Sequence, residues 1–338
     1  MRILIVRTSA LGDVVHCLPV LTALRRHYPE AHIGWVVEAA MAPVLAGHPD
    51  LNEVLAVRLR QWRRQPWRAE VRRQITSAMA RLRRFKADLV LDLMGNHKAG
   101  VLAWLSGCGQ RLGPARPFRR EPSSALWINR GTAISGDHAV DRALAVLGGL
   151  NLPPEAPSFD PEKLFRAPAP QAEQLLAGHP EPFALIAPGA GWGNKQYPAP
   201  WWGAVARALR EHAGIASWVP AGPGEEALAA TVAASSDGAA RDLGVVDLPT
   251  LAALMRQARL VLGGDSGPLH MAHALGASVL CLMGPTDPHR HGPYGAPERA
   301  LWTELPCSFC YRRLPATKGC LLSLAPRQVA ARALELLA

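Results

Sequence analysis

The stretch RTSALGDVVHCLPVL, residues 7–21, follows a short apolar run and leads into a helical pattern. Residues 3–6 are four consecutive apolar side chains, whose β-branched content predicts a buried parallel strand. Gly12 permits a tight turn or a positive φ, and the apolar helical periodicity begins at Val14. Strand, turn and helix in this order begin a βαβ unit. Asp13 then stands at the carboxyl end of the strand, where open α/β sheets bind ligands.

Asp13 has two possible uses. A carboxylate near a helix N-terminus accepts hydrogen bonds from backbone N–H groups and complements the helix dipole. A carboxylate at a strand end can also take a proton from a substrate. Position alone favours capping, so the remaining motifs must decide whether Asp13 takes part in catalysis as well.

Alternation of strands and helices continues along the whole chain. Strands are predicted at residues 32–37, 53–57, 87–92, 183–187, 217–220, 260–262 and 278–282, and helices over residues 71–85, 201–211 and 327–337. A proline cluster predicts a linker: Pro153, Pro154, Pro157, Pro161, Pro168 and Pro170. We therefore expect an α/β protein with two Rossmann-like domains, residues 1–160 and 161–338, whose parallel sheets face each other across a cleft. The last helix is expected to pack back on the first domain.

Composition fits a soluble two-domain protein. The chain has 338 residues, of which 49% are hydrophobic and 19% charged. No apolar run is long enough for a transmembrane helix, and the N-terminus does not resemble a secretory signal, so we expect a cytoplasmic location. The net charge of +10 favours an anionic partner without choosing among nucleic acid, phospholipid and phosphorylated sugar.

Two local compositions are unusual. Residues 58–86 hold ten arginines interleaved with Trp62 and Trp67, which suits either a solvated helix face or a surface for anionic ligands or a membrane. No nucleic-acid-binding motif accompanies them. The cysteines Cys307, Cys310 and Cys320 have no obvious fourth zinc ligand, which favours simple thiols.

Three glycine-bearing loops, residues 188–193, 221–225 and 263–267, follow predicted strands in the second half. Backbone N–H groups at such turns bind anions, although the spacing matches neither a Walker A loop nor a dinucleotide fingerprint. Lys195 lies just beyond the first loop, where it could neutralise a leaving diphosphate. His270 and His273 share a helix face, a spacing more typical of packing than of metal binding. Because no D-x-D pair occurs, we expect a reaction that needs neither metal nor other cofactor.

Taken together, RTSALGDVVHCLPVL, PGAGWGNKQYP, GPGEE, GGDSGPLHMAHALG and GPTDP resemble the lipopolysaccharide heptosyltransferase family, glycosyltransferase family 9, in sequence and in order. The resemblance implies a GT-B fold, with the acceptor mainly on the first domain and the nucleotide sugar on the second. It implies ADP-L-glycero-β-D-manno-heptose as donor, the inner core of lipopolysaccharide as acceptor, and inversion without metal. It also implies peripheral association with the cytoplasmic face of the inner membrane.

Other motifs bear on the choice of acceptor. VVE at residues 36–38, REP at 120–122 and HAVDR at 138–142 look most like the heptosyltransferase I members, which add the first heptose to Kdo on lipid A. The CSFC segment at residues 307–310 looks more like heptosyltransferase II. Heptosyltransferase I is therefore the leading expectation, and heptosyltransferase II or another family member is the alternative.

The resemblance also implies site residues, with Asp13 as general base and Lys195 beside the donor phosphates. Donor-binding candidates are Gly189, Gly193, Lys195, Gly222, Glu225, Asp265, Ser266, Gly267 and His270, with the register between Glu225 and Glu226 open. Acceptor-binding candidates are Ser9, Gly12, Arg60, Arg63, Arg64 and Arg120. Two other classes stay open: a nucleotide-sugar 2-epimerase, and a non-catalytic protein that binds nucleic acid or anionic lipid.

Overall fold

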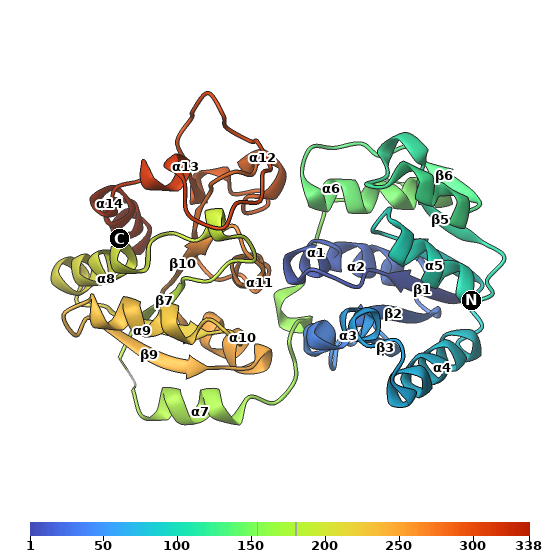
Figure 1. Ribbon diagram of the computed structural model, residues 1–338, viewed down its shortest axis with the longest axis horizontal. Coiled ribbons are helices and arrows are strands. Elements are labelled where there is room, and N and C mark those ends of the chain that lie inside the picture. Colours follow the sequence, from blue (N-terminus) through green and yellow to red (C-terminus); the bar gives the residue numbers. More distant parts are fainter. Residues whose placement is uncertain (154, 180) are drawn as a thin grey trace. The chain divides into compact units, whose positions relative to one another are not determined.

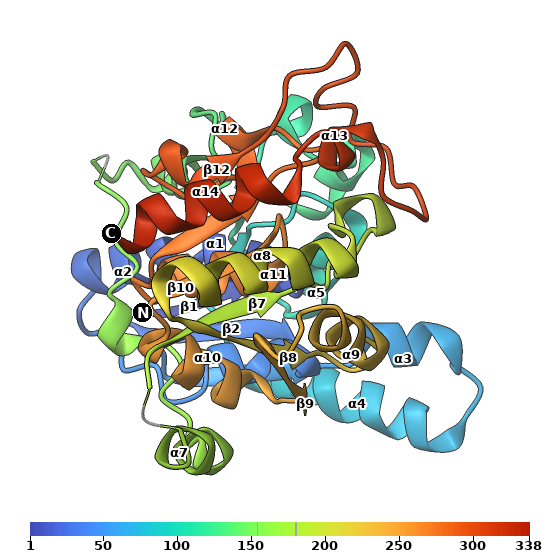
Figure 2. The same cartoon turned by 90° about the vertical axis from the view of Figure 1, so that its left-hand side faces the viewer.

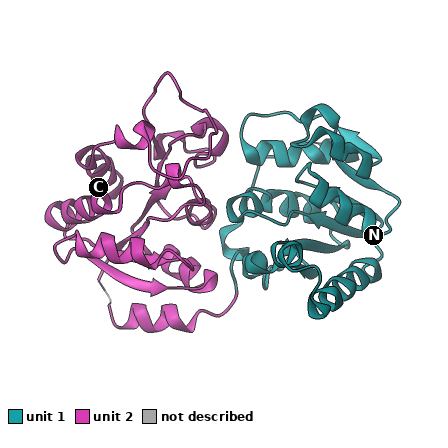
Figure 3. Ribbon diagram, viewed as in Figure 1, with its two compact units in different colours: residues 1–166 teal, residues 167–338 magenta. Residues whose placement is uncertain are grey.

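The computed structural model describes residues 1–153, 155–179 and 181–338. It divides into two compact units, Met1–Arg166 and Ala167–Ala338 (Figure 3). Each unit is a six-stranded sheet whose neighbouring strands pair in parallel, with helices packed on it (Figure 1). The predicted α/β fold with two Rossmann-like sheets is therefore confirmed. The division after residue 166 compares with a predicted boundary after residue 160.

Unit 1 has the strand order β3-β2-β1-β4-β5-β6. Its strands are β1 (Arg2–Val6), β2 (His32–Glu38), β3 (Glu53–Val57), β4 (Leu89–Asp92), β5 (Arg111–Pro114) and β6 (Arg130–Thr132). Its helices are α1 (Leu11–His16), α2 (Leu18–His27), α3 (Leu59–Arg64), α4 (Ala69–Arg84), α5 (His97–Leu105) and α6 (Ala139–Leu144). Short 3₁₀ helices are η1 (Ala39–Val44), η2 (Arg116–Phe118), η3 (Pro122–Trp127), η4 (Ala145–Leu150) and η5 (Pro161–Lys163). The central strand β1 is fully buried from its second residue onward, as its apolar run predicts.

Unit 2 has the order β12-β11-β10-β7-β8-β9, the same pattern read from the opposite edge. Its strands are β7 (Phe183–Ala187), β8 (Ala216–Ala221), β9 (Ala240–Val245), β10 (Leu260–Gly264), β11 (Val279–Leu282) and β12 (Ala300–Leu301). Its helices are α7 (Pro170–Ala177), α8 (Ala199–Ala213), α9 (Glu226–Ala234), α10 (Leu248–Gln257), α11 (Gly267–Ala274), α12 (Pro288–His291), α13 (Gly319–Leu322) and α14 (Pro326–Leu337). The 3₁₀ helices are η6 (Gly193–Lys195) and η7 (Pro297–Arg299).

The helices correct one expectation and show where the last helix packs within its own unit. Gly12 is the second residue of α1, which begins at Leu11, so this glycine is helical and not the turn that the sequence suggested. The last helix, α14, lies alongside α8 (Figure 2), and its buried Val329, Ala330 and Ala333 join the core of unit 2. Those side chains complete the apolar cover of the second sheet, so α14 is part of that unit's own core.

The predicted linker is partly attached to unit 1. Lys163 Nζ lies 3.0 Å from Asp50 Oδ2, and His27 Nε2 lies 2.6 Å from Glu155 Oε1. Pro170 begins α7, where its fixed φ and missing N–H suit the first turn of a helix. Pro154, a member of the predicted proline cluster, lies outside the described residues.

Candidate active site

Asp13 lies in the first turn of α1, immediately beyond β1. Its Oδ2 accepts a hydrogen bond from the Ala10 N–H at 3.0 Å, and its Oδ1 lies 2.7 Å from Arg7 Nη2. The carboxylate therefore helps to cap α1, as the sequence suggested. Its side chain is still 38% exposed, so capping leaves part of the carboxylate accessible to a substrate.

Arg7 fixes the second oxygen of this carboxylate. The guanidinium is largely buried, with 16% of the side chain exposed, and it also donates to the Leu93 carbonyl beyond β4. Burial disfavours its charged form, but the charges of Asp13 and nearby groups outweigh burial and raise the pKa of Arg7. The Arg7 guanidinium thus holds the Asp13 carboxylate in a fixed position at the start of α1.

The predicted acceptor arginines occupy different places in unit 1. Arg60 and Arg64 line a pocket of about 630 Å³ together with Arg58 and Glu38. The Glu38 carboxylate accepts hydrogen bonds from the backbone N–H groups of Leu59 and Arg60, so it caps α3 and anchors this arginine cluster to the end of β2.

The other four predicted acceptor-binding residues lie elsewhere in unit 1. Arg63 is exposed on α3 but is not among the residues that line the pocket. Arg120 is exposed between η2 and η3, and its backbone packs on Gly95 in the loop after β4. Ser9 is half-buried just before α1, and Gly12 is buried within it. The structure thus groups Arg60 with Arg64 in one pocket, and places Arg120 by the loop after β4.

A buried ion pair holds the segment that carries Arg120. Arg119 Nη2 lies 2.5 Å from Asp92 Oδ2, and neither side chain is exposed. Arg119 Nε also donates to Ser124 Oγ at 2.7 Å, while Asp92 Oδ1 accepts from the N–H of Gly95. The sequence placed Asp92 only at the end of the predicted strand over residues 87–92, and it gave Arg119 no role. An aspartate that ends a buried strand was the available signal, but its partner lies 27 residues further along.

In unit 2, Glu225 joins the first two glycine loops. Its Oε2 accepts the Gly222 N–H at 3.2 Å, and a Cβ at Gly189 would lie 2.1 Å from its Oε1. A side chain at 189 would therefore have to displace the end of the Glu225 side chain from these loops. Glu226 is exposed in the first turn of α9, so it is Glu225 that faces these loops.

Asp265, at the carboxyl end of β10, is the centre of a second cluster. Its Oδ2 lies 2.5 Å from Lys195 Nζ and accepts the Thr286 hydroxyl at 2.5 Å, while its Oδ1 lies 3.0 Å from His270 Nε2. Burial opposes ionisation, but the His270 hydrogen bond and the Lys195 charge outweigh it and hold the pKa of Asp265 well below its usual range. The carboxylate therefore joins the loops that follow β7, β10 and β11. Thr286 lies in the quoted GPTDP motif but was not predicted as a site residue.

Ser266 stands at the N-terminus of α11 with Gly267 as the first helical residue. Its Oγ is buried and has no hydrogen-bond partner among the described residues. A buried hydroxyl without a partner is costly, and the N–H groups of a helix N-terminus attract anions. This arrangement suits a phosphate oxygen that would accept from the hydroxyl.

The first glycine loop is held from outside by residues 312–317. Asn194 is buried and donates to the Arg312 carbonyl at 2.8 Å, and a Cβ at Gly193 would lie 2.0 Å from the Pro315 carbonyl oxygen. Lys195 Nζ lies 4.3 Å from the centre of the Trp192 ring, which favours a cation–π contact. The glycine at 193 is therefore required by packing, whatever it contributes to a ligand.

The family follows from comparison with known proteins. The profile of glycosyltransferase family 9 (heptosyltransferase) matches residues 75–320, more than half of the chain. The chain belongs to glycosyltransferase family 9. Lipopolysaccharide heptosyltransferase 1 of Pseudomonas aeruginosa is 32% identical over 316 residues, which are 93% of this chain and 87% of that protein.

Solved structures of similar proteins agree with this assignment. Escherichia coli heptosyltransferase WaaC with ADP superposes with a TM-score of 0.81 at 26% identity, over 99% of this family 9 chain and all of that one. WaaC with ADP-2-deoxy-2-fluoro heptose gives a TM-score of 0.78, also at 26% identity, and covers 99% of each chain. Both share the GT-B fold that the motifs implied.

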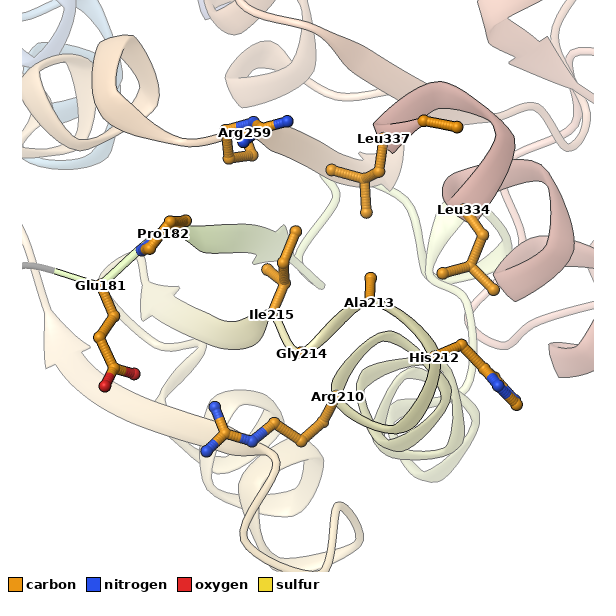
Figure 4. Close-up of a pocket in the computed structure, with 11 residues that line it drawn as sticks. Glu181, Pro182, Arg210, His212, Ala213, Gly214, Ile215, Arg259, Leu334 and Leu337 are labelled. Carbon is orange, nitrogen blue, oxygen red and sulfur yellow. The ribbon is translucent and has the colours of Figure 1, made fainter.

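The glycosyltransferase also has a large pocket in unit 2, at the end of the sheet opposite to the glycine loops. This open pocket of about 860 Å³ lies at the amino ends of β7, β8 and β10, beside the C-terminal turns of α8 and α14 (Figure 4). Arg210 and Arg259 line it together with apolar residues such as Leu334 and Leu337. Ligands of open α/β sheets bind at the carboxyl ends, so this pocket is not the predicted site.

In the part of the glycosyltransferase that the structure describes, no group of three or more His, Cys, Asp or Glu side chains could hold a metal ion. Cys307 and Cys310 are exposed thiols, and Cys320 is a half-buried one. Within the described residues, no helix combines the length and the apolar character needed to cross a bilayer.

Proposed function

We propose that this family 9 enzyme transfers L-glycero-D-manno-heptose from ADP-heptose to Kdo of the lipopolysaccharide inner core, as heptosyltransferase I does. The observation that carries the donor half is the cluster at the carboxyl ends of β7 and β10. An unpartnered Ser266 hydroxyl stands there at a helix N-terminus, next to Asp265 with its bound Lys195. The hydroxyl, the helix N-terminal N–H groups and the Lys195 ammonium suit a diphosphate, while the Asp265 carboxylate positions Lys195.

The chemistry requires one base. In a single displacement the acceptor hydroxyl attacks the anomeric carbon, the bond to the ADP oxygen breaks, and the configuration inverts. Asp13 takes the hydroxyl proton as the new bond forms. The leaving ADP carries its negative charge away on oxygen, and Lys195 with the helix N-terminal N–H groups stabilises that charge.

Similarity supports the choice of substrates. The Pseudomonas aeruginosa relative is named lipopolysaccharide heptosyltransferase 1, and the solved WaaC structures contain ADP or an ADP-heptose analogue. The pocket lined by Arg58, Arg60 and Arg64 supplies guanidinium groups, which suit acceptor phosphates and carboxylates. In this proposal the enzyme acts at the cytoplasmic face of the inner membrane, where its acceptor is anchored.

The test is product mass after incubation with ADP-heptose and either Kdo₂-lipid A or its heptosylated form. We expect addition of one heptose to Kdo₂-lipid A. Addition only to the heptosylated form would instead support heptosyltransferase II, the alternative that the CSFC segment at 307–310 suggests. Turnover of nucleotide sugar without any acceptor would favour an epimerase.

Asp13→Asn tests the base. The amide oxygen can still accept from the Ala10 N–H, so α1 is expected to keep its cap. Transfer is expected to fall by about 10²–10⁴-fold, the usual contribution of general-base catalysis, with unchanged affinity for ADP. Rates come from the mass assay and affinity from calorimetry. Wild-type turnover in this variant would remove Asp13 from the mechanism.

A further inference from the structure

A group of exposed apolar side chains in unit 1 has no part in the proposed chemistry. Trp104 on α5 is 53% exposed and Leu126 on η3 is 64% exposed. Trp127 follows Leu126 directly, and its ring centre lies 5.7 Å from that of Trp104. These three residues form what we call the α5–η3 patch. Large apolar groups exposed next to one another are typical of binding surfaces, because covering them is favourable.

The patch is rigidly supported from beneath. Trp127 packs directly on α5, since a Cβ at Gly100 would lie 2.6 Å from its Cδ1. Its indole N–H donates to His97 Nδ1 at 3.0 Å, and His97 Nε2 lies 2.9 Å from Ser123 Oγ. Trp104 leans on this fixed ring. The half-buried Trp127 ring is therefore held in place, and it gives the exposed Trp104 ring a fixed partner to pack against.

Cationic side chains border the patch. Arg83, which is exposed, donates to the carbonyl of Leu105 at the end of α5, and Arg111 donates to the carbonyl of Trp127. Lys98 is exposed on the same helix as Trp104. An acidic neighbour, Glu121, accepts the His97 N–H at the start of α5. Tryptophan and leucine bordered by arginine and lysine form the usual combination of a protein surface that rests on anionic lipid.

We propose that the α5–η3 patch is the surface by which this protein binds an anionic lipid bilayer, with Trp104 and Leu126 inserted among the headgroups. The proposal extends the proposed function, in which the acceptor is a membrane lipid. The arginine-rich segment at 58–86 is the competing surface. Of its two tryptophans, Trp62 is buried in the core and only Trp67, 70% exposed, is available to a membrane.

Vesicle co-sedimentation of the full chain tests this, with phosphatidylcholine alone and with phosphatidylcholine containing phosphatidylglycerol at 3:1. The wild type is expected to bind the anionic vesicles, and Trp104→Ala with Leu126→Ala is expected to weaken binding about tenfold, which corresponds to about 1.4 kcal/mol. Trp67→Ala is the matched control and is expected to bind like the wild type. Circular dichroism and the melting temperature check that each variant folds.

Three outcomes would overturn the proposal: no binding of the wild type to anionic vesicles, unchanged binding of the double variant, or an equal loss in Trp67→Ala. A separate assay with a delipidated, water-soluble Kdo acceptor keeps the two proposals apart. The double variant should turn this acceptor over at the wild-type rate. If the wild type does not transfer heptose to this soluble acceptor, the proposed function is contradicted, but the vesicle result still stands.

Discussion

Single side chains around Asp265 show how burial and charge act against each other. The carboxylate is almost fully buried, yet it stays ionised because Lys195, His270 and Thr286 all approach it. His291 experiences the opposite balance. Burial, assisted by the nearby cations, lowers its pKa to about 4 even though Asp265 acts to raise it. The same cluster therefore holds one group charged and another neutral.

His291 gives a pH prediction with a definite sign. The unfolded chain binds a proton at this histidine below about pH 6.5, whereas the folded chain does so only near pH 4. Its contribution to stability is therefore lost as the pH falls from about 6.5 to about 4. Between pH 7 and pH 5, we expect the melting temperature of His291→Gln to fall less than the melting temperature of the wild type.

The control for this measurement lies on the same helix. His289 is exposed on α12, so His289→Gln should keep the wild-type difference between the two melting temperatures. Melting curves recorded by circular dichroism at both pH values suffice. A His291→Gln protein with the same difference as the wild type would show that this residue does not contribute to the acid sensitivity.

At the scale of elements, the Asp92–Arg119 pair connects β4 to the loop before η3. It is the reason that a segment with little regular structure can present Arg120 in a fixed place. Arg119→Met is expected to destabilise the protein by about 3–5 kcal/mol, because it leaves the Asp92 carboxylate buried without its partner. Urea unfolding measures the loss.

Two variants make this prediction specific. Arg116→Met removes an exposed arginine from neighbouring η2 and should change stability little. Asp92→Asn combined with Arg119→Met should recover part of the loss, since it removes the unpaired charge. If Arg119→Met is as stable as Arg116→Met, the pair does not hold the segment.

Elements differ in how far their sequence predicts them. The buried strands β1, β4, β7 and β10 read directly from apolar runs, because both faces of a central parallel strand are covered. Strands β5 and β6, with the sequences RLGP and RGT, were not predicted. Their glycine, proline and charged residues have low strand propensity, and pairing with β4 and with each other makes them strands.

At the scale of the whole molecule, the catalytic proposal depends on charge that the protein itself supplies. The chain carries a net charge of +10, and in the proposed mechanism Lys195 and helix N-termini offset the charge of the diphosphate. We therefore expect transfer to continue at the wild-type rate after dialysis against EDTA. The mass assay with and without added Mg²⁺ provides the measurement. A loss of activity that a divalent ion restores would contradict a metal-independent reaction.

By itself, the sequence determined the fold class and the positions of the main strands along the chain, because apolar runs are local patterns. Its motifs also indicated the family, and they selected Asp13, Lys195 and Asp265 as site candidates. The tertiary structure alone decided that Glu225 faces the glycine loops, that Thr286 joins Asp265, that Arg119 neutralises Asp92, and that Trp104 meets Trp127 at the surface. Each of these is a contact between loops or helices distant along the chain, and only packing brings such groups within a few ångströms of one another.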